Sequence, residues 1–127
     1  MNTFKKKERL NSKKNIQRLF EQGDNFFSYP FKIYFYLYRA EVKNYEASVL
    51  FSIGKKQFKH AVDRNRIKRL CRESYRLNKT LLNSKLEETQ NSMEVAFVYI
   101  AKTSPEYDDL QKKMKKILLR LAPENFE

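Results

Sequence analysis

The run MEVAFVYIAK, residues 93–102, limits the possible folds more than any other part of the chain. Apolar residues occupy both sets of alternating positions in this run, so a strand formed here would be apolar on both faces. Such a strand needs cover on both faces, which predicts a central place in a sheet. Its uninterrupted apolar part, VAFVYIA, is far shorter than the roughly 20 residues that cross a bilayer, so no membrane span is predicted.

Two further strands are predicted upstream, where apolar residues recur at every second position. In residues 31–38, FKIYFYLY, the set that points toward the core begins at Phe31 and ends at Leu37. Residues 47–54, ASVLFSIG, repeat the pattern. The connection between the two strands, RAEVKNYE, is short and polar, which favours an antiparallel hairpin over a crossover.

The other face of the strand at residues 31–38 carries Lys32, Tyr34, Tyr36 and Tyr38. One interpretation is a half-exposed sheet face, because Tyr has a good strand propensity. The other is a stacking platform, because aromatic rings beside a lysine suit unpaired bases and their phosphates. The strand pattern alone leaves both interpretations open.

Three amphipathic helices are predicted from apolar residues spaced three or four apart. Their approximate bounds are Ser12 to Gln22, Ala61 to Leu82, and Pro105 or Tyr107 to Leu121. Ser12 is a preferred N-cap residue, and Gly23 is a stop signal. The chain has 127 residues and neither a linker nor an internal repeat, so residues 1–127 are predicted to form a single domain.

Net charge narrows the range of partners. The chain has 27 Lys and Arg against 15 Asp and Glu, a balance of +12 that attracts polyanions. Its N-terminal residues, MNTFKKKERLNSKK, lack the apolar segment of a secretory signal, which predicts a cytoplasmic location. The single cysteine, Cys71, cannot form an internal disulfide and could supply only one metal ligand, so a packed thiol is predicted.

The positive charge is concentrated in DRNRIKRLCRESYR, residues 63–76, within the second predicted helix. At about 100° per residue, Ile67, Leu70 and Cys71 fall on one side. The residues on the opposite side are Arg64, Asn65, Lys68, Arg69, Arg72, Arg76 and Lys79. A solvated helix usually interleaves both signs, because like charges three or four residues apart repel. The single sign, together with guanidinium groups that can bind phosphate through two hydrogen bonds, favours a nucleic acid partner.

The same stretch resembles the RNR motif of the bacterial ribonuclease P protein family. That motif has a paired Lys, a short loop, Ala-Val-x-Arg-Asn-Arg, and an apolar residue followed by Lys-Arg. The matching residues are Lys55, Lys56, Ala61, Val62, Arg64, Asn65, Arg66, Ile67, Lys68 and Arg69. The flanking segments LNSKKNIQRLFEQG, YPFKIYFY and VAFVYIAKTS are similar to the family's first helix, first strand and ending. The resemblance thus covers nearly the whole chain.

The resemblance implies an α+β fold of the ribosomal protein S5 domain 2-like type. The expected fold is a two-layer α/β sandwich in the order α-β-β-β-α-β-α, with a left-handed βαβ crossover. It also implies that an RNA subunit with bound Mg²⁺ removes the 5′ leader from precursor tRNA. The protein would bind that catalytic RNA, hold the leader between the first helix and the sheet, and relax the RNA's need for Mg²⁺. The implied partners are ribonuclease P RNA and precursor tRNA, with no membrane, no small-molecule substrate and no cofactor bound by the protein itself.

Site residues follow from the resemblance by position. Those expected to contact the catalytic RNA are Arg64, Asn65, Arg66, Lys68, Arg69, Arg72, Arg76, Lys55 and Lys56. Those expected to line the leader cleft are Ile16, Phe20, Phe31, Lys32, Tyr34, Tyr36 and Lys102. Two departures stand out: Ile16 replaces a common aromatic residue, and the loop QFKH is one residue longer than the commonest form.

Residues that could catalyse hydrolysis are few. His60 is the only histidine and lies beside the basic helix. Asp108 and Asp109 suit the first turn of the last helix, where acids complement the helix dipole. We therefore predict no catalytic residue and no metal ligand in the polypeptide.

Two other function classes stay open. The first is a general RNA-binding or ribosome-associated protein without cleavage activity. The second, an amphipathic protein of the membrane surface, is less favoured because the core needs the apolar side of the basic helix.

Overall fold

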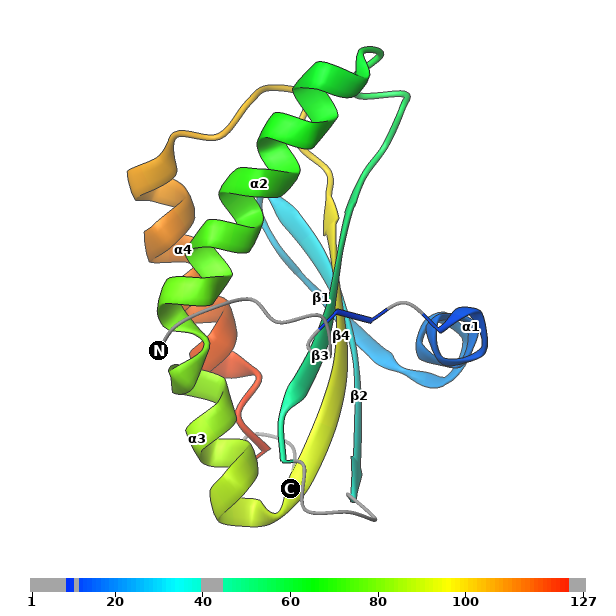
Figure 1. Cartoon of the computed structure of the whole chain (residues 1–127), viewed down its shortest axis with the longest axis vertical. Coiled ribbons are helices and arrows are strands. Elements are labelled where there is room, and N and C mark those ends of the chain that lie inside the picture. The colour runs from blue at the N-terminus through cyan, green and yellow to red at the C-terminus, as the bar shows by residue number, and fades with distance from the viewer. Residues whose placement is uncertain (1–8, 11, 40–44, 124–127) are drawn as a thin grey trace.

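The computed structural model describes residues 9–10, 12–39 and 45–123 as an α+β fold (Figure 1). Its elements are α1 (Lys13–Gln22), β1 (Asp24–Ser28), β2 (Phe31–Arg39), β3 (Ala47–Ile53), α2 (Ala61–Asn78), α3 (Thr80–Thr89), β4 (Asn91–Tyr99) and α4 (Tyr107–Arg120). The order is therefore α-β-β-β-α-α-β-α, which differs from the expected α-β-β-β-α-β-α by one additional helix.

The four-stranded mixed sheet has the order β1-β2-β4-β3. β4 pairs antiparallel with β2 and parallel with β3, which confirms its predicted central place. The predicted hairpin between the strands at 31–38 and 47–54 is wrong, because β4 lies between them. Only β4 is apolar on both faces, so it takes the place where both faces are covered. Residues 40–44 of the connection lie outside the described part of the chain.

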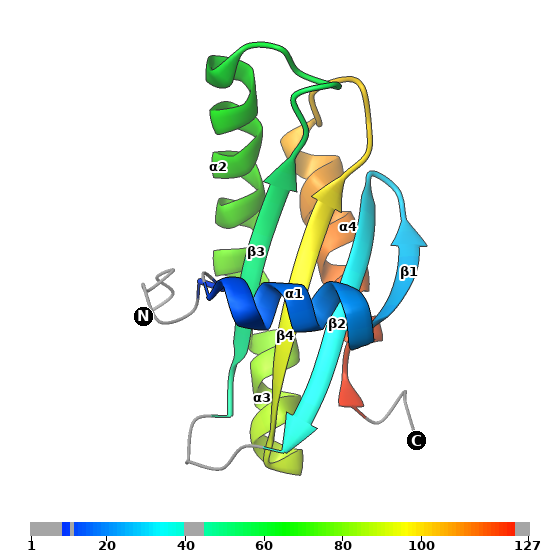
Figure 2. The same ribbon diagram turned by 90° about the vertical axis from the view of Figure 1, so that its right-hand side faces the viewer.

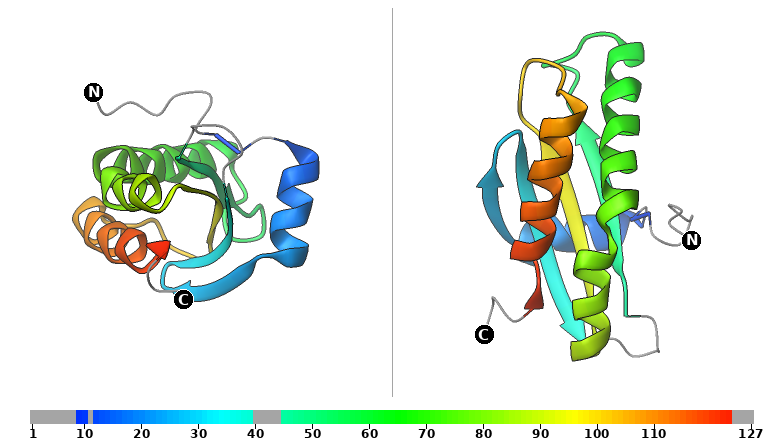
Figure 3. Two further views of the ribbon diagram at one scale, coloured as in Figure 1. Left: turned by 90° about the horizontal axis from the view of Figure 1, so that it is seen from below. Right: turned by 90° about the vertical axis from the view of Figure 1, so that its left-hand side faces the viewer.

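Two element boundaries differ from the predictions. Residues 24–28, for which no strand was predicted, form the edge strand β1, which pairs antiparallel with β2. β1 is mostly exposed and lacks an apolar alternation that would have predicted a strand. The predicted helix over 61–82 is two helices, α2 and α3, which divide at Lys79 (Figure 3). Lys79 itself keeps helical dihedral angles, so no local signal marks the division.

Helices cover both faces of the sheet. α2, α3 and α4 pack on one face around the main core, and α1 crosses the other face (Figure 2). Leu19 of α1 is fully buried and packs with Leu10 and with Ala96 of β4. The predicted two-layer sandwich thus corresponds to the sheet and the layer of α2, α3 and α4. On the other face, α1 covers part of the sheet, because β4 is apolar on that face as well.

Two predicted capping residues hold α1 in place. The Ser12 hydroxyl accepts a hydrogen bond from the backbone N–H of Asn15, and Gly23 follows the last helical residue. A Cβ at Gly23 would lie 2.5 Å from the Leu19 carbonyl oxygen and 2.7 Å from that of Phe35. Only glycine therefore lets the chain pass so tightly from α1 into β1, which fixes α1 across β2.

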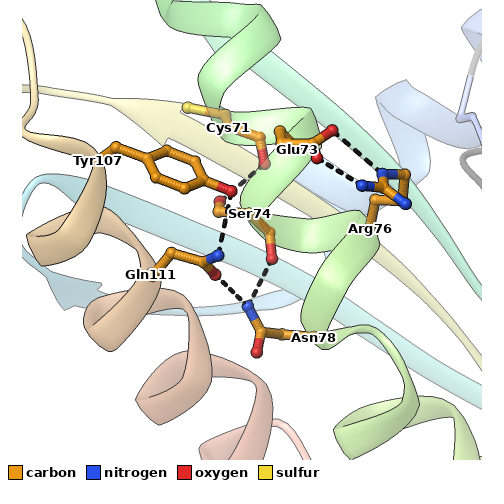
Figure 4. A network of polar contacts seen from close by, with 7 residues as sticks. All are labelled: Cys71, Glu73, Ser74, Arg76, Asn78, Tyr107 and Gln111. Carbon is orange, nitrogen blue, oxygen red and sulfur yellow. Dashed lines mark hydrogen bonds and ion pairs between the residues drawn. The ribbon is translucent and has the colours of Figure 1, made fainter. Parts of the chain in front are cut away.

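A buried polar network locks α2 to α4 (Figure 4). The Asn78 amide donates to the Ser74 carbonyl and to the Gln111 side chain, and the Gln111 amide donates to the Tyr107 hydroxyl over 3.0 Å. Cys71 is buried beside this network, and burial raises the pKa of its thiol to about 12. The prediction of a packed thiol is confirmed. The network orients α2 so that its basic side points away from the sheet.

Candidate nucleic-acid interface

The exposed side of α2 is the first candidate surface. Ile67, Cys71 and Tyr75 are buried against the sheet, so the residues on the opposite side of the helix face outward. Arg66 and Arg69 are exposed. Asn65 is exposed as well, and Lys68 and Arg72 are partly buried. The predicted two-faced helix is confirmed, except that Lys79, expected on the basic side, is buried and only 9% exposed.

Two of the predicted arginines also hold the protein together. The Arg64 guanidinium donates to the carbonyl oxygens of Phe58 at 2.7 Å and Lys59 at 2.8 Å, so it anchors the loop before α2. Arg76 donates from Nε to a carboxylate oxygen of Glu73 over 3.1 Å, and this pairing lowers the pKa of Glu73. The exposed side of α2 is therefore predominantly basic, with Asp63 in the first turn as one acid and Glu73, paired with Arg76, as the other.

A hollow of about 250 Å³ lies between α2 and the edge strand β3. Its charged lining residues are Arg9, Lys68 and Arg72, and Val49 and Leu50 of β3 line it as well. Burial, together with the charge of Arg9, lowers the pKa of Arg72. The sequence analysis missed Arg9, because its approach to α2 depends on a bridge to Val49 that no local pattern indicates.

The second candidate surface is the part of the sheet that α1 leaves open, at the end where β2 begins. Phe20 of α1 is 40% exposed, and its ring centroid lies 4.6 Å from that of Tyr34 on β2. The Lys32 ammonium lies 5.0 Å from the Tyr34 ring and 5.1 Å from the ring of Phe27, which is 65% exposed. We call Phe20, Phe27, Lys32 and Tyr34 the aromatic cluster. Its exposed rings beside an ammonium group suit unpaired bases and phosphates.

Three predicted cleft residues lie elsewhere or are covered. Phe31 is fully buried in the main core against Phe97 and Tyr99, on the face opposite the aromatic cluster. It cannot line the cleft, because it alternates with Lys32 along β2. Ile16 of α1 is partly buried against the sheet, and the Arg18 guanidinium covers the ring of Tyr36.

An ion pair between Arg18 and Glu94 connects α1 to the central strand β4. Arg18 Nη2 lies 2.8 Å from a carboxylate oxygen of Glu94, which is only 2% exposed. The guanidinium also covers the rings of Tyr36 at 4.8 Å and Tyr38 at 5.6 Å. Hydrogen bonding to Glu94 raises the pKa of Arg18. Neither residue was predicted as important, although a single Glu within the apolar run MEVAFVYIA is a signal that could have been used.

Three predicted lysines lie at one end of the sheet. β3 and β4 are parallel, so their carboxyl ends lie at the same end, followed by loops with the exposed residues Lys55, Lys56 and Lys102. α2 begins at this end as well (Figure 1). The predicted lysines therefore lie at the end of the sheet where α2 begins.

Within the ranges 9–10, 12–39 and 45–123, no group of three or more His, Cys, Asp or Glu side chains could hold a metal ion. None of the helices in these ranges is long and apolar enough to span a bilayer.

Comparison with known proteins identifies the family. The family model for ribonuclease P matches residues 4–122. The chain belongs to the bacterial ribonuclease P protein family. The ribonuclease P protein component of Porphyromonas gingivalis is 40% identical over 117 residues, which cover 92% of this chain and 85% of the relative. That of Chlorobium phaeobacteroides is 31% identical over 127 residues, covering 93% and 87%.

Solved structures support the fold. The ribonuclease P protein of Thermotoga maritima matches with a TM-score of 0.69 at 19% identity, over 89% of this chain and 96% of that one. The Staphylococcus aureus protein matches with a TM-score of 0.64 at 22% identity, over 91% and 95%. As a member of the ribonuclease P protein family, the chain is a protein subunit of the enzyme that removes 5′ leaders from precursor tRNA. This membership decides against a general RNA-binding protein without cleavage.

Proposed function

We propose that the exposed side of α2 binds the catalytic RNA of ribonuclease P and that the aromatic cluster holds the 5′ leader of precursor tRNA. The observation that carries the proposal is the outward-facing, predominantly basic surface around Arg66 and Arg69, on which the cations outnumber the acids Asp63 and Glu73. Their guanidinium groups can each donate two hydrogen bonds to a phosphate. Asn65, Lys68 and Arg72 extend this surface. Lys55, Lys56 and Lys102 would contact RNA at the end of the sheet where α2 begins.

The division of labour follows from the same surfaces. Mg²⁺ is supplied through the RNA, and the protein contributes positive charge that shields phosphates. The location is cytoplasmic, where the RNA and its substrate occur.

The finer fold assignment, an S5 domain 2-like sandwich with a left-handed crossover, has support in the arrangement of β3 and β4. In Figure 2 both strands run upward, β4 lies to the right of β3, and the helices that connect them lie behind the sheet. Right-handed crossovers dominate in other folds.

Leader binding is tested by Tyr34→Ala and Phe20→Ala. Stacking of one base on an aromatic ring contributes about 1–3 kcal/mol, so each variant is expected to weaken holoenzyme binding to precursor tRNA by about that amount. Equilibrium binding of precursor tRNA and of mature tRNA without a leader measures the effect. Equal losses for both substrates, or no loss for the precursor, would contradict leader binding at this cluster.

A further inference from the structure

The last helix carries a second basic face that the proposed function does not use. Between Asp109 and the end of α4 there are five cations and no acid: Lys112, Lys113, Lys115, Lys116 and Arg120. The apolar side of α4 is buried, so Lys112, Lys115 and Lys116 are exposed. Among the residues that the structure describes, no acid pairs with these three lysines. We call them the α4 lysine face.

The other two cations of α4 have different surroundings. Arg120 lies over the ring of Phe26, 4.0 Å from its centroid. Lys113 lines a separate hollow together with Tyr29 and Glu106. Both therefore face the β1 side of the molecule and are left out of the α4 lysine face, whose nearest acids in α4 are Asp108 and Asp109, one turn before Lys112.

The α4 lysine face lies beside the RNA-binding side of α2. The two helices pack side by side on the same face of the sheet and run in the same direction (Figure 3). The hydrogen bonds from Asn78 to Gln111 and from Gln111 to Tyr107 hold them in this arrangement (Figure 4). Because both helices bury their apolar sides toward the sheet, their basic sides point outward together.

The chemistry of the face indicates which part of an RNA it fits. Lys112 and Lys116 are one turn apart, about 6 Å along the helix axis, so their charges repel at a small cost. Lysine is a flexible point charge without the fork of arginine. The three lysines have no aromatic residue among them that could stack on a base. Such a surface binds the phosphate backbone of an RNA helix without reading its sequence.

We propose that the α4 lysine face binds the phosphate backbone of a second helical segment of the catalytic RNA, next to the segment held by α2. The inference rests on the proposed function, because it assigns another contact to the same RNA. The α4 contact adds salt-sensitive affinity, whereas the arginines of α2 make the oriented contacts. Together they widen the RNA-binding surface from one helix to two.

The first test is the salt dependence of binding to ribonuclease P RNA at constant Mg²⁺. The variant Lys112→Gln/Lys116→Gln removes two phosphate contacts, so the slope of log K against log salt becomes shallower by about 1.4–1.8. The control Arg39→Gln/Lys85→Gln removes the same amount of positive charge. Its two residues lie toward the end of the sheet opposite to the start of α2, and we expect it to leave the slope unchanged. A slope for the α4 variant equal to that of the control overturns the inference. Circular dichroism checks that both variants fold.

The Arg66→Ala/Arg69→Ala variant separates this inference from the proposed function. If that variant loses affinity while the α4 variant behaves like its control, only the α4 contact is refuted. If the Arg66→Ala/Arg69→Ala variant binds normally, the proposed function fails first. Binding to anionic phospholipid vesicles that depends on the two lysines, with an unchanged slope on RNA, would assign the face to a membrane and overturn the inference.

The second test locates the RNA segment. Iron–EDTA attached through Lys116→Cys or Arg69→Cys cuts nearby RNA strands. Cys71 is buried, so the introduced cysteine is the labelled one. The inference expects cuts from position 116 in a helical segment distinct from the one cut from position 69. An absence of cuts from position 116 in the assembled complex contradicts it.

Discussion

The Arg18→Ala variant is expected to lower the free energy of unfolding by about 2–3 kcal/mol. It leaves the Glu94 carboxylate, only 2% exposed, without its partner at 2.8 Å. Loss of one member of a fully buried pair costs about 3–5 kcal/mol. The Arg18 side chain is 36% exposed, so solvent already screens part of the interaction and the expected cost is lower. Urea unfolding measures the change.

The double variant Arg18→Ala/Glu94→Gln is the control for this prediction. A neutral amide at position 94 removes the unpaired charge, so the double variant should regain part of the lost stability. The Arg18→Ala variant should also weaken binding of precursor tRNA more than that of mature tRNA, because α1 carries Phe20 of the aromatic cluster. A stability loss below about 0.5 kcal/mol, the range of ordinary surface substitutions, would show that the ion pair does not hold α1.

The Arg66→Ala/Arg69→Ala variant is expected to bind ribonuclease P RNA about 100-fold more weakly, which corresponds to about 2.7 kcal/mol. Hydrogen bonds to charged groups contribute about 1.5–3 kcal/mol each. Because solvent screens both exposed side chains, the expected loss of binding free energy is smaller than the sum of two such contributions. Both residues are exposed, so stability should change by no more than about 0.5 kcal/mol. Filter binding at constant salt measures the affinity.

Arg76→Ala provides a matched comparison on the same helix. Its guanidinium is paired with Glu73, so part of its charge is already neutralised within the protein. Its loss should weaken RNA binding clearly less than the loss of Arg66 or Arg69 alone. An equal or larger effect at Arg76 would move the centre of the RNA contact toward the end of α2.

Local patterns predicted the parts of the fold that depend on local structure. The alternation in residues 31–38 placed Lys32 and Tyr34 on one face, and the helical spacing in residues 63–76 separated the buried from the basic side of α2. The doubly apolar run correctly predicted a central strand. These patterns succeed because each depends on one element and the solvent around it.

The order of the strands, and the contacts that Arg9 and Arg18 make across the sheet, depend on residues that are far apart in the sequence. The short connection after β2 suggested a hairpin, but burial of β4 on both faces outweighed the preference for neighbouring strands to pair. Arg9 reaches α2 only because its segment pairs with β3, and Arg18 meets Glu94 only because α1 crosses the second face. No periodicity within one element contains that information.

For the candidate site, the motif predicted the α2 surface better than the leader cleft. Phe31 was assigned to the cleft by position, although its own alternation placed it in the core, and the structure agrees with the alternation. Tyr36 lies on the predicted face, but Arg18 covers its ring. Cover by another helix is a tertiary feature, so the strand pattern could not predict it.

The most direct test of the account is cleavage of precursor tRNA by a bacterial ribonuclease P RNA at low Mg²⁺. The account predicts little cleavage by the RNA alone, strong stimulation by the unmodified protein with release of the 5′ leader, and loss of most of that stimulation in the Arg66→Ala/Arg69→Ala variant. Failure of the unmodified protein to stimulate cleavage, or equal stimulation by the variant, would contradict the assignment of the α2 surface to the catalytic RNA.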